Sequence, residues 1–202
     1  MTTFLLIRHA ATDSVGQRLS GRTAGVHLNE AGRAQAQALA ARLKDMPITA
    51  VYCSPLERAV ETAAPIAAIF DIQPVINAYF LEIDFGAWTN RAFAELQESA
   101  HFQAFNAFRS HTRVPGGESM LEAQTRIITG MEQLCQQHPQ ETIAIISHAD
   151  IIKAALAYYA GIHLDLMQRI EISPASVSIL TIYNDTARIL LINDTGQLNN
   201  SG

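Results

Sequence analysis

Two short, almost wholly apolar runs stand out along the chain, and each one leads into a histidine. Residues 4–7 lead into Arg8 and His9. Residues 142–146 lead through a serine into His148. A run without polar alternation is typical of a strand that is buried on both faces, as in a parallel sheet. Because ligands bind beyond the carboxyl ends of such strands, the pattern places Arg8, His9 and His148 at a ligand-binding edge.

Helical and extended patterns alternate between and after these two strands. Apolar residues recur at helical spacing, which predicts helices or helical patches at residues 30–44, 55–70, 91–109, 120–137 and 151–160. Short strands are expected at residues 48–53 and 74–76, and a final hairpin at residues 177–183 and 187–192. Ser54 and Pro55 stand at the start of the helix expected at residues 55–70. We expect Ser54 to cap this helix and Pro55 to take its first position.

This order of elements predicts an α/β fold. We expect a three-layer sandwich with a mostly parallel central sheet, helices on both faces and an antiparallel edge strand. The 202 residues suffice for one sizeable core, and we expect residues 1–202 to form a single domain. The hairpin leaves a free sheet edge on which a second copy of the chain has room to pair. A homodimer therefore stays open as an alternative to a monomer.

Composition narrows the classes of protein to which the chain can belong. Hydrophobic residues make up 49% and charged residues 16% of the sequence, which is a globular profile. The formal net charge of -5 and the pI near 5.8 argue against a broad nucleic-acid or anionic-membrane surface. No apolar run approaches the ~20 residues of a membrane span, and Cys53 and Cys135 lack metal-type spacing. We therefore expect a cytoplasmic protein with reduced thiols that binds neither nucleic acid nor membranes.

The two strand-end histidines suggest chemistry on a phosphoryl group. Arg58 falls in the first turn of the helix after residues 48–53, near the same edge, although spacing alone supports a surface salt bridge equally well. Guanidinium forks and imidazole N–H donors match phosphate. A neutral imidazole attacks phosphorus when its other nitrogen is held as a donor, which makes His9 the candidate nucleophile. Glu82 and Asp84, in an aromatic-rich loop, are candidates for protonating the leaving group.

Five segments resemble those of the histidine phosphatase superfamily, the group that is similar to the phosphoglycerate mutases. They are LIRHA, SPLERAVETA, LEIDFGAW, PGGES and SHAD, and they follow the family's order over most of the chain. A lone Arg-His pair is a weak signal, whereas five segments in register make chance agreement improbable. The resemblance implies that His9 is the phosphorylated nucleophile and Glu82 the proton donor, which leaves Asp84 as a solvated loop carboxylate.

The same resemblance implies which residues bind the substrate. Arg8, Arg58 and His148 match the family's phosphoryl-binding positions. Ser20 and Gly21 fall near the loop with which family members contact the rest of the substrate. The implied mechanism uses no metal ion and no cofactor, and its partner is a small phosphorylated substrate.

Departures from the mutase pattern favour hydrolysis over phosphoryl transfer. Val15 and Asp150 each replace an asparagine of the mutases. Arg109 and Arg113 stand apart where mutases carry paired arginines. A pocket that retains a bisphosphate needs such groups. We therefore predict a metal-independent phosphomonoesterase, a histidine phosphatase that hydrolyses a small phosphorylated metabolite through a phosphohistidine on His9.

Two alternatives and two local questions stay open. One alternative is phosphoryl transfer of the phosphoglycerate mutase type, and the other is a non-catalytic module that binds a phosphorylated ligand. A pure binding module has no use for a proton donor, so Glu82 argues against the second. Ala10 replaces the glycine usual in the family, which the turn tolerates if φ is negative. Trp88 belongs either to a hydrophobic lid or to the core.

Overall fold

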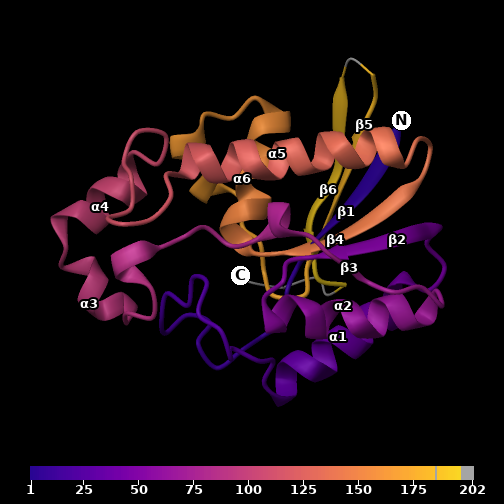
Figure 1. The fold of residues 1–202 in the computed structure, drawn as a ribbon, viewed down its shortest axis with the longest axis horizontal. Coiled ribbons are helices and arrows are strands. Elements are labelled where there is room, and N and C mark those ends of the chain that lie inside the picture. The colour runs from indigo at the N-terminus through magenta and orange to yellow at the C-terminus, as the bar shows by residue number, and fades with distance from the viewer. Residues whose placement is uncertain (185, 197–202) are drawn as a thin grey trace, which may run out of the picture.

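The computed structural model describes residues 1–184 and 186–196. Their strands form one mixed sheet in the order β3-β2-β4-β1-β5-β6, which crosses the middle of the molecule (Figure 1). Strands β1 to β4 run parallel to one another, β5 runs antiparallel to β1, and β6 runs antiparallel to β5 at the edge. The strands are β1 (Thr2–Arg8), β2 (Ile48–Cys53), β3 (Val75–Ile76), β4 (Thr142–Ser147), β5 (Val177–Ile182) and β6 (Ala187–Asp194).

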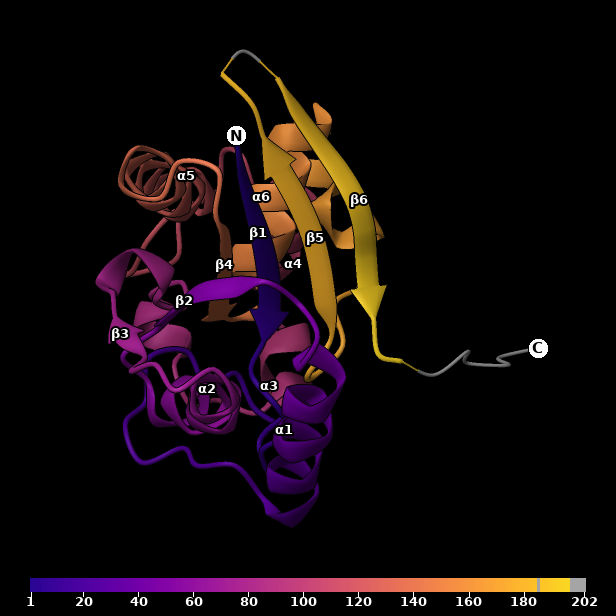
Figure 2. The ribbon, with the colours of Figure 1, turned by 90° about the vertical axis from the view of Figure 1, so that its right-hand side faces the viewer.

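Alternation along β1 divides the hydrophobic core into two parts. Phe4 and Leu6 face one part and Leu5 and Ile7 face the other, and all four side chains are buried. Helices α5 and α6 cover the first face, and α1 and α2 cover the second (Figure 2). The predicted three-layer α/β sandwich is therefore confirmed. The covering helices are α1 (Glu30–Leu43), α2 (Glu57–Ile69), α5 (Met120–Gln137) and α6 (Ala149–Ala160).

A long connection between β3 and α5 builds a lobe beside the sheet, at the left of Figure 1. Trp88 is 4% exposed, and its ring packs edge-on against Phe102 and Phe105 with centroids 5.2 and 5.4 Å away. Trp88 is therefore a core residue. Among the described helices, none combines the length and apolar character that a bilayer crossing requires. The shorter elements are η1 (Ala78–Phe80), η2 (Gly86–Trp88), α3 (Phe93–Gln97), α4 (Ala100–Ala107) and η3 (Leu164–Arg169).

The start of α2 differs from the sequence prediction. The helix begins at Glu57 with Leu56 as its N-cap residue, and no side chain caps it. The expectation that Ser54 caps this helix, with Pro55 as its first residue, is therefore wrong. The Ser54 hydroxyl instead lies 2.8 Å from Nε2 of His148, which satisfies a buried imidazole nitrogen.

The N-terminus of α1 rests on the turn that follows His9. Asn29 caps the helix, because its Oδ1 accepts a hydrogen bond from Gly32 N at 2.8 Å. The backbone N–H of Asn29 donates to the carbonyl oxygen of Ala11 at 3.1 Å. A Cβ atom at Gly32 would lie 2.0 Å from that same oxygen, so only glycine fits between the helix and the turn.

We expect Gly32→Ala to destabilise the protein, although alanine is favoured over glycine in a helix interior by about 1 kcal/mol. The added methyl group must displace the helix or the turn at Ala11, and overpacking of this kind costs roughly 1–3 kcal/mol. Urea unfolding followed by circular dichroism measures the free energy of unfolding. Gln37→Ala, at an exposed position of the same helix, is the control and should stay within about 0.5 kcal/mol of the wild type. Equal or greater stability of Gly32→Ala would contradict the close contact.

Candidate active site

Two histidines meet at the carboxyl edge of the sheet. His9 follows β1, and His148 follows β4 as the N-cap residue of α6. The register of the two parallel strands pairs Arg8 with Ser147, and the backbone N–H of His9 donates to the carbonyl oxygen of Ser147 at 2.9 Å. The two imidazole ring centroids are 5.2 Å apart, and both side chains are buried. The strand pairing therefore brings the histidines side by side.

Hydrogen bonding fixes the tautomer of His9. Its Nδ1 lies 2.8 Å from the carbonyl oxygen of Ala10, which only accepts, so Nδ1 carries the proton. Nε2 is then unprotonated, and its lone pair accepts a hydrogen bond from Nε of Arg58 at 3.3 Å. Burial, followed by the charges of Arg58 and Arg8, lowers the pKa of His9 to about 3. The ring is therefore neutral near pH 7 and has the lone pair that a nucleophile needs.

Arg58 and Arg8 bring guanidinium groups to the same cavity. Arg58 lies in the first turn of α2 and is 2% exposed. Its Nη2 donates to the carbonyl oxygen of Gly21 at 2.8 Å and lies 3.4 Å from Nδ1 of His148. Arg8 donates from Nη1 to the carbonyl oxygen of Ile172 at 2.7 Å. Nη1 of Arg58 and Nε of Arg8 have no hydrogen-bond partner among the described residues, and buried cationic donors of this kind fit an anionic ligand.

His148 is held by a hydroxyl group on one side and faces the cavity residues on the other. Its Nε2 lies 2.8 Å from the Ser54 hydroxyl, and its Nδ1 lies 4.0 Å from a carboxylate oxygen of Glu82. Burial and then the charge of Arg58 hold the pKa of His148 well below its usual range. Both imidazoles are thus neutral beside two guanidinium groups.

Glu82 has a pKa suited to both giving and taking a proton. Its Oε1 accepts a hydrogen bond from the backbone N–H of Ile83 at 3.0 Å. Burial, and then the charge of Asp150, raises the pKa of Glu82 to about 7, although Arg58 works in the opposite direction. A carboxyl group with this pKa exists in both protonation states near pH 7, as a general acid and base must.

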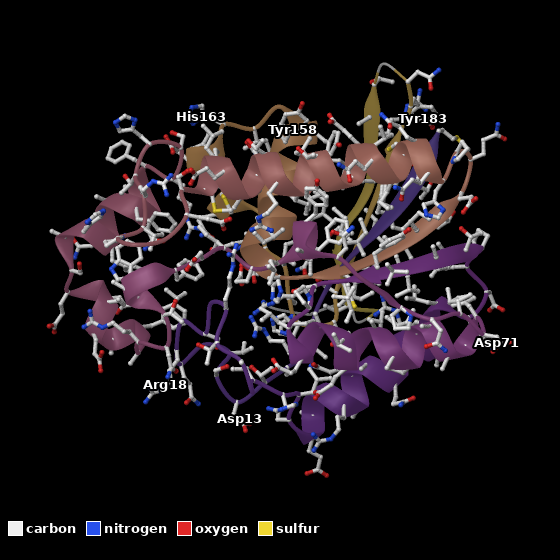
Figure 3. The ribbon with its side chains drawn as sticks, in the orientation of Figure 1. Asp13, Arg18, Asp71, Tyr158, His163 and Tyr183 are labelled. Atoms are coloured by element: carbon white, nitrogen blue, oxygen red, sulfur yellow. The ribbon has the colours of Figure 1, made fainter. Side chains whose placement is uncertain are left out.

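Arg8, His9, Arg58 and Glu82 line a cavity of about 160 Å³, and the fully buried ring of His148 lies behind them, within 3.4 Å of Arg58 Nη2. The loop at residues 13–25 forms its outer wall, with Asp13 toward α1 and Arg18 toward α3 (Figure 3). Ser20 and Gly21 line the cavity from this loop, and the Ser20 hydroxyl donates to the Ser14 hydroxyl at 2.7 Å. Asp84 is not part of the lining, and its Oδ1 accepts from the backbone N–H of Gly86 at 2.9 Å. The apolar part of the wall comes from Val15, Leu19, Phe85 and Phe93.

Sequence reasoning missed two hydroxyl groups that support the site. Ser54 holds the ring of His148, as described above. Thr62 accepts a hydrogen bond from the backbone N–H of Ala10 at 3.0 Å and donates to the carbonyl oxygen of Arg58 at 2.7 Å. Both residues lie within SPLERAVETA, so the segment itself was the available signal. Ala10 is absent from the residues with positive φ, so the turn accepts alanine at this position without strain.

The sequence also gave no sign of a buried ion pair at the far side of the cavity. Asp150 accepts a hydrogen bond from Nη1 of Arg109 at 2.8 Å, and the Arg109 side chain stacks over the Phe105 ring. Burial alone would raise the pKa of Asp150, but Arg109 and then Lys153 offset this and leave it lowered. Asp150 is therefore a carboxylate at the cavity wall.

The described residues contain no cluster of three or more His, Cys, Asp or Glu side chains arranged to hold a metal ion. The groups gathered at this edge of the sheet are instead two neutral imidazoles, two guanidinium groups and a carboxyl group. They belong to His9, Arg8, Arg58 and Glu82, which line the cavity, and to His148, which lies against Arg58 and Glu82. Such a set can bind a phosphoryl group, attack it and protonate what leaves.

Several known proteins are similar to this chain in sequence. The bifunctional protein Rv2228c of Mycobacterium tuberculosis is 32% identical over 201 residues, which cover 98% of this chain and 55% of that protein. The chain thus spans about half the length of the mycobacterial relatives that it matches. Phosphoserine phosphatase 1 of Hydrogenobacter thermophilus is 27% identical over 203 residues, which cover 98% of this chain and 95% of that protein.

Solved structures agree with these relatives. YhfR of Bacillus stearothermophilus superposes with a TM-score of 0.88 at 26% identity, over 95% of this chain and 96% of that chain. The alpha-ribazole phosphatase of Shigella flexneri superposes with a TM-score of 0.85 at 26% identity, over 96% of both chains. The family model of the histidine phosphatase superfamily (branch 1) matches residues 4–195. The chain therefore belongs to the histidine phosphatase superfamily, in its first branch.

Proposed function

We propose that the chain is a metal-independent phosphomonoesterase that hydrolyses a small phosphorylated metabolite through a phosphohistidine on His9. One observation carries the proposal: a neutral imidazole with an unprotonated Nε2 lies beside buried, unpaired guanidinium donors and a carboxyl group with a pKa of about 7. Relatives that are named as phosphatases, from Hydrogenobacter thermophilus and Shigella flexneri, support hydrolysis as the reaction.

Arg8, Arg58 and His148 bind the phosphoryl group in this proposal. The free N–H groups of the two guanidinium groups donate to its oxygens. The ring of His148 adapts, because the Ser54 hydroxyl both donates and accepts. When the hydroxyl donates to Nε2, the proton of the neutral ring resides on Nδ1, which gives up its contact with Arg58 Nη2 and donates to the phosphoryl group. Ser20 and Gly21 bound the space for the leaving group.

The first step transfers the phosphoryl group to His9. The lone pair on Nε2 forms a bond to phosphorus while the bond from phosphorus to the leaving oxygen breaks. Protonated Glu82 gives its proton to that oxygen, so that an alcohol leaves and a carboxylate remains. The proton on Nδ1 stays hydrogen-bonded to Ala10, which supports the positive charge that the ring acquires.

The second step hydrolyses the phosphohistidine. The Glu82 carboxylate takes a proton from a water molecule, whose oxygen attacks phosphorus. The bond between phosphorus and Nε2 breaks, and its electron pair returns to the ring of His9. Inorganic phosphate leaves, and Glu82 is protonated again. The two steps together consume one ester and one water and release one alcohol and one phosphate.

The cavity argues against phosphoryl transfer of the mutase type. Arg109 is paired with Asp150, so its charge is already neutralised before any second phosphoryl group arrives. Val15 contributes an apolar side chain to the wall, where it offers no hydrogen bond. A site that reorients a bisphosphate needs further cationic and amide donors.

His9→Ala should abolish phosphate release and remove the acid-labile label that the wild type acquires from a radiolabelled phosphate ester. Loss of the nucleophile is expected to lower turnover on the order of a thousandfold or more. The assay uses a panel of phosphorylated metabolites in the presence of a chelator. His111→Ala, at an exposed position, is the control and should keep both activities. Undiminished turnover in His9→Ala would contradict the assignment of His9 as the nucleophile. If the wild type releases no phosphate from any ester of the panel, a non-catalytic binding module would be favoured.

Glu82→Gln should slow hydrolysis of an alkyl phosphate by roughly two to four powers of ten, because the leaving oxygen loses its proton donor. Competition by inorganic phosphate should persist. In the wild type, kcat/KM should fall as the pH rises through about 7, where Glu82 loses its proton, whereas His9 stays neutral above its pKa of about 3. In Glu82→Gln, kcat/KM should not show this decrease at high pH.

The pH dependence of protein stability provides a second test of the raised pKa of Glu82. The pKa of Glu82 in the folded protein, about 7, lies above its ordinary value of 4.5, so the folded state keeps a proton that the unfolded chain loses between these pH values. The stability of the wild type relative to Glu82→Gln should therefore decrease as the pH rises from about 4.5 to about 7. Thermal unfolding at several pH values measures it, and a constant difference would show that Glu82 titrates normally.

Arg58→Ala should weaken inhibition by inorganic phosphate and vanadate. A buried hydrogen bond between charged groups contributes about 1.5–3 kcal/mol, which corresponds to an inhibition constant raised about tenfold or more. Arg91→Ala removes a guanidinium group from an exposed ion pair with Glu95 and should leave the constant unchanged. An unchanged inhibition constant in Arg58→Ala would place Arg58 outside the phosphoryl site.

A further inference from the structure

The loop that carries Glu82 is held by side chains from other parts of the chain. Arg126, on α5, donates from Nη1 to the carbonyl oxygens of Tyr79 and Leu81 at 2.9 and 2.8 Å. Its Nη2 lies 3.4 Å from the carbonyl oxygen of Glu82 itself. One guanidinium group thus contacts three backbone carbonyl oxygens within residues 79–82, where the chain passes from η1 into the cavity wall.

Glu118 connects this arginine to the far side of the same loop. Its carboxylate lies 3.1 Å from Nη2 of Arg126 and accepts a hydrogen bond from the backbone N–H of Asp84 at 3.0 Å. The backbone N–H of Glu118 donates in turn to the carbonyl oxygen of Asp84 at 2.9 Å. A Cβ atom at Gly117 would lie 2.2 Å from that oxygen, so the two segments are in direct contact. Residues 82 and 84 are therefore both fixed from outside.

Arg22 adds a third connection, from the loop that bounds the cavity. Its Nε donates to the carbonyl oxygen of Glu82 at 2.8 Å, and its Nη2 pairs with Glu118 at 2.9 Å. The side chains of Arg22, Glu118 and Arg126 are 30, 21 and 17% exposed, so their mutual contacts are partly shielded from water. Two guanidinium groups from separate segments thus converge on the carbonyl oxygen of Glu82, and Glu118 pairs with both of them.

Glu82 has little support of its own. Within the described part of the chain, its carboxyl group accepts one hydrogen bond, from the adjacent Ile83 N–H. The backbone between η1 and η2 pairs with no strand of the sheet. The direction of the Glu82 side chain therefore depends on how its backbone is held, and a misplaced proton donor loses much of its effect.

We propose that Glu118 and Arg126 are positioning residues that hold the Glu82 carboxyl group at the leaving-group oxygen. The proposal rests on the function proposed above, since it assigns to Glu82 the transfer of a proton. Neither residue lines the cavity, so they act through the backbone of the loop rather than on the substrate. The arrangement explains why PGGES, far along the chain from Glu82, accompanies the active-site segments.

Comparison of two substrates tests the proposal. Glycerol phosphate releases an alkoxide that must be protonated, whereas p-nitrophenyl phosphate releases a stable anion that needs no proton. Arg126→Met should lower kcat for glycerol phosphate by about 10- to 100-fold and kcat for p-nitrophenyl phosphate by less than about threefold. Inhibition by inorganic phosphate should change by less than about twofold, because the phosphoryl-binding groups stay in place.

Two further variants make the result specific. Glu118→Gln keeps the shape of the side chain but removes its charge, and it should shift the substrate ratio in the same direction as Arg126→Met. This second variant keeps the proposal testable if Arg126→Met fails to fold. Arg42→Met is the matched control: Arg42, near the end of α1, pairs with Asp194 of the edge strand β6 at 3.0 Å. Its substrate ratio should equal that of the wild type.

The outcomes separate the proposal from the function on which it rests. If Glu82→Gln leaves the substrate ratio unchanged, the proton-donor assignment fails and the positioning role fails with it. If Glu82→Gln changes the ratio and neither Arg126→Met nor Glu118→Gln does, only the positioning role is overturned. An equal loss on both substrates, together with weaker phosphate inhibition, would show that the two residues merely support the fold.

Discussion

The parallel pairing of β1 with β4 is the constraint on which the rest of the site depends. Because Arg8 pairs with Ser147, the chain leaves the sheet at the same level on both strands, and His9 and His148 emerge together. The pairing continues one residue beyond the strand, through the hydrogen bond from His9 N to Ser147 O. Both imidazoles are buried at this edge, and burial, followed by the charge of Arg58, lowers their pKa values and holds them neutral.

Burial of the Arg8 and Arg58 guanidinium groups leaves an excess of positive charge in the site, and an anionic ligand offsets this charge well. Burial is the largest effect on the pKa of Arg8 and of Arg58 and lowers both, while Glu82 raises both. A partly protonated Glu82 neutralises the pair incompletely. A phosphate ester with two negative charges supplies the missing charge and the acceptors for the unpaired N–H groups. In the proposed function, the preference for a phosphoryl group is therefore a consequence of burying guanidinium groups at a sheet edge.

Local patterns in the sequence sufficed for the layers of the fold and for the histidines at the ends of β1 and β4, because burial on both faces shows directly in an apolar run. They did not settle Arg58, whose direction depends on where α2 begins, and the helix begins two residues later than the pattern suggested. The pairing of Arg109 with Asp150 joins residues 41 positions apart. Contacts of that range leave no periodic trace, so the resemblance to a family carried information that periodicity did not.

Different kinds of interaction hold His9 and the loop that carries Glu82. This difference determines which substitutions are expected to affect each of them. A backbone ladder fixes the proposed nucleophile, His9, whereas side chains fix the loop of the proposed proton donor, Glu82. Arg22 belongs to the loop whose Gly21 carbonyl receives Arg58, so the loop that bounds the leaving group also contacts the donor. Under the proposed function, we therefore expect changes in that loop to alter substrate fit and proton transfer together. The β1–β4 ladder holds the backbone of the proposed nucleophile, whereas its ring is connected to the loop through Arg58, which donates to His9 Nε2 and to the carbonyl oxygen of Gly21.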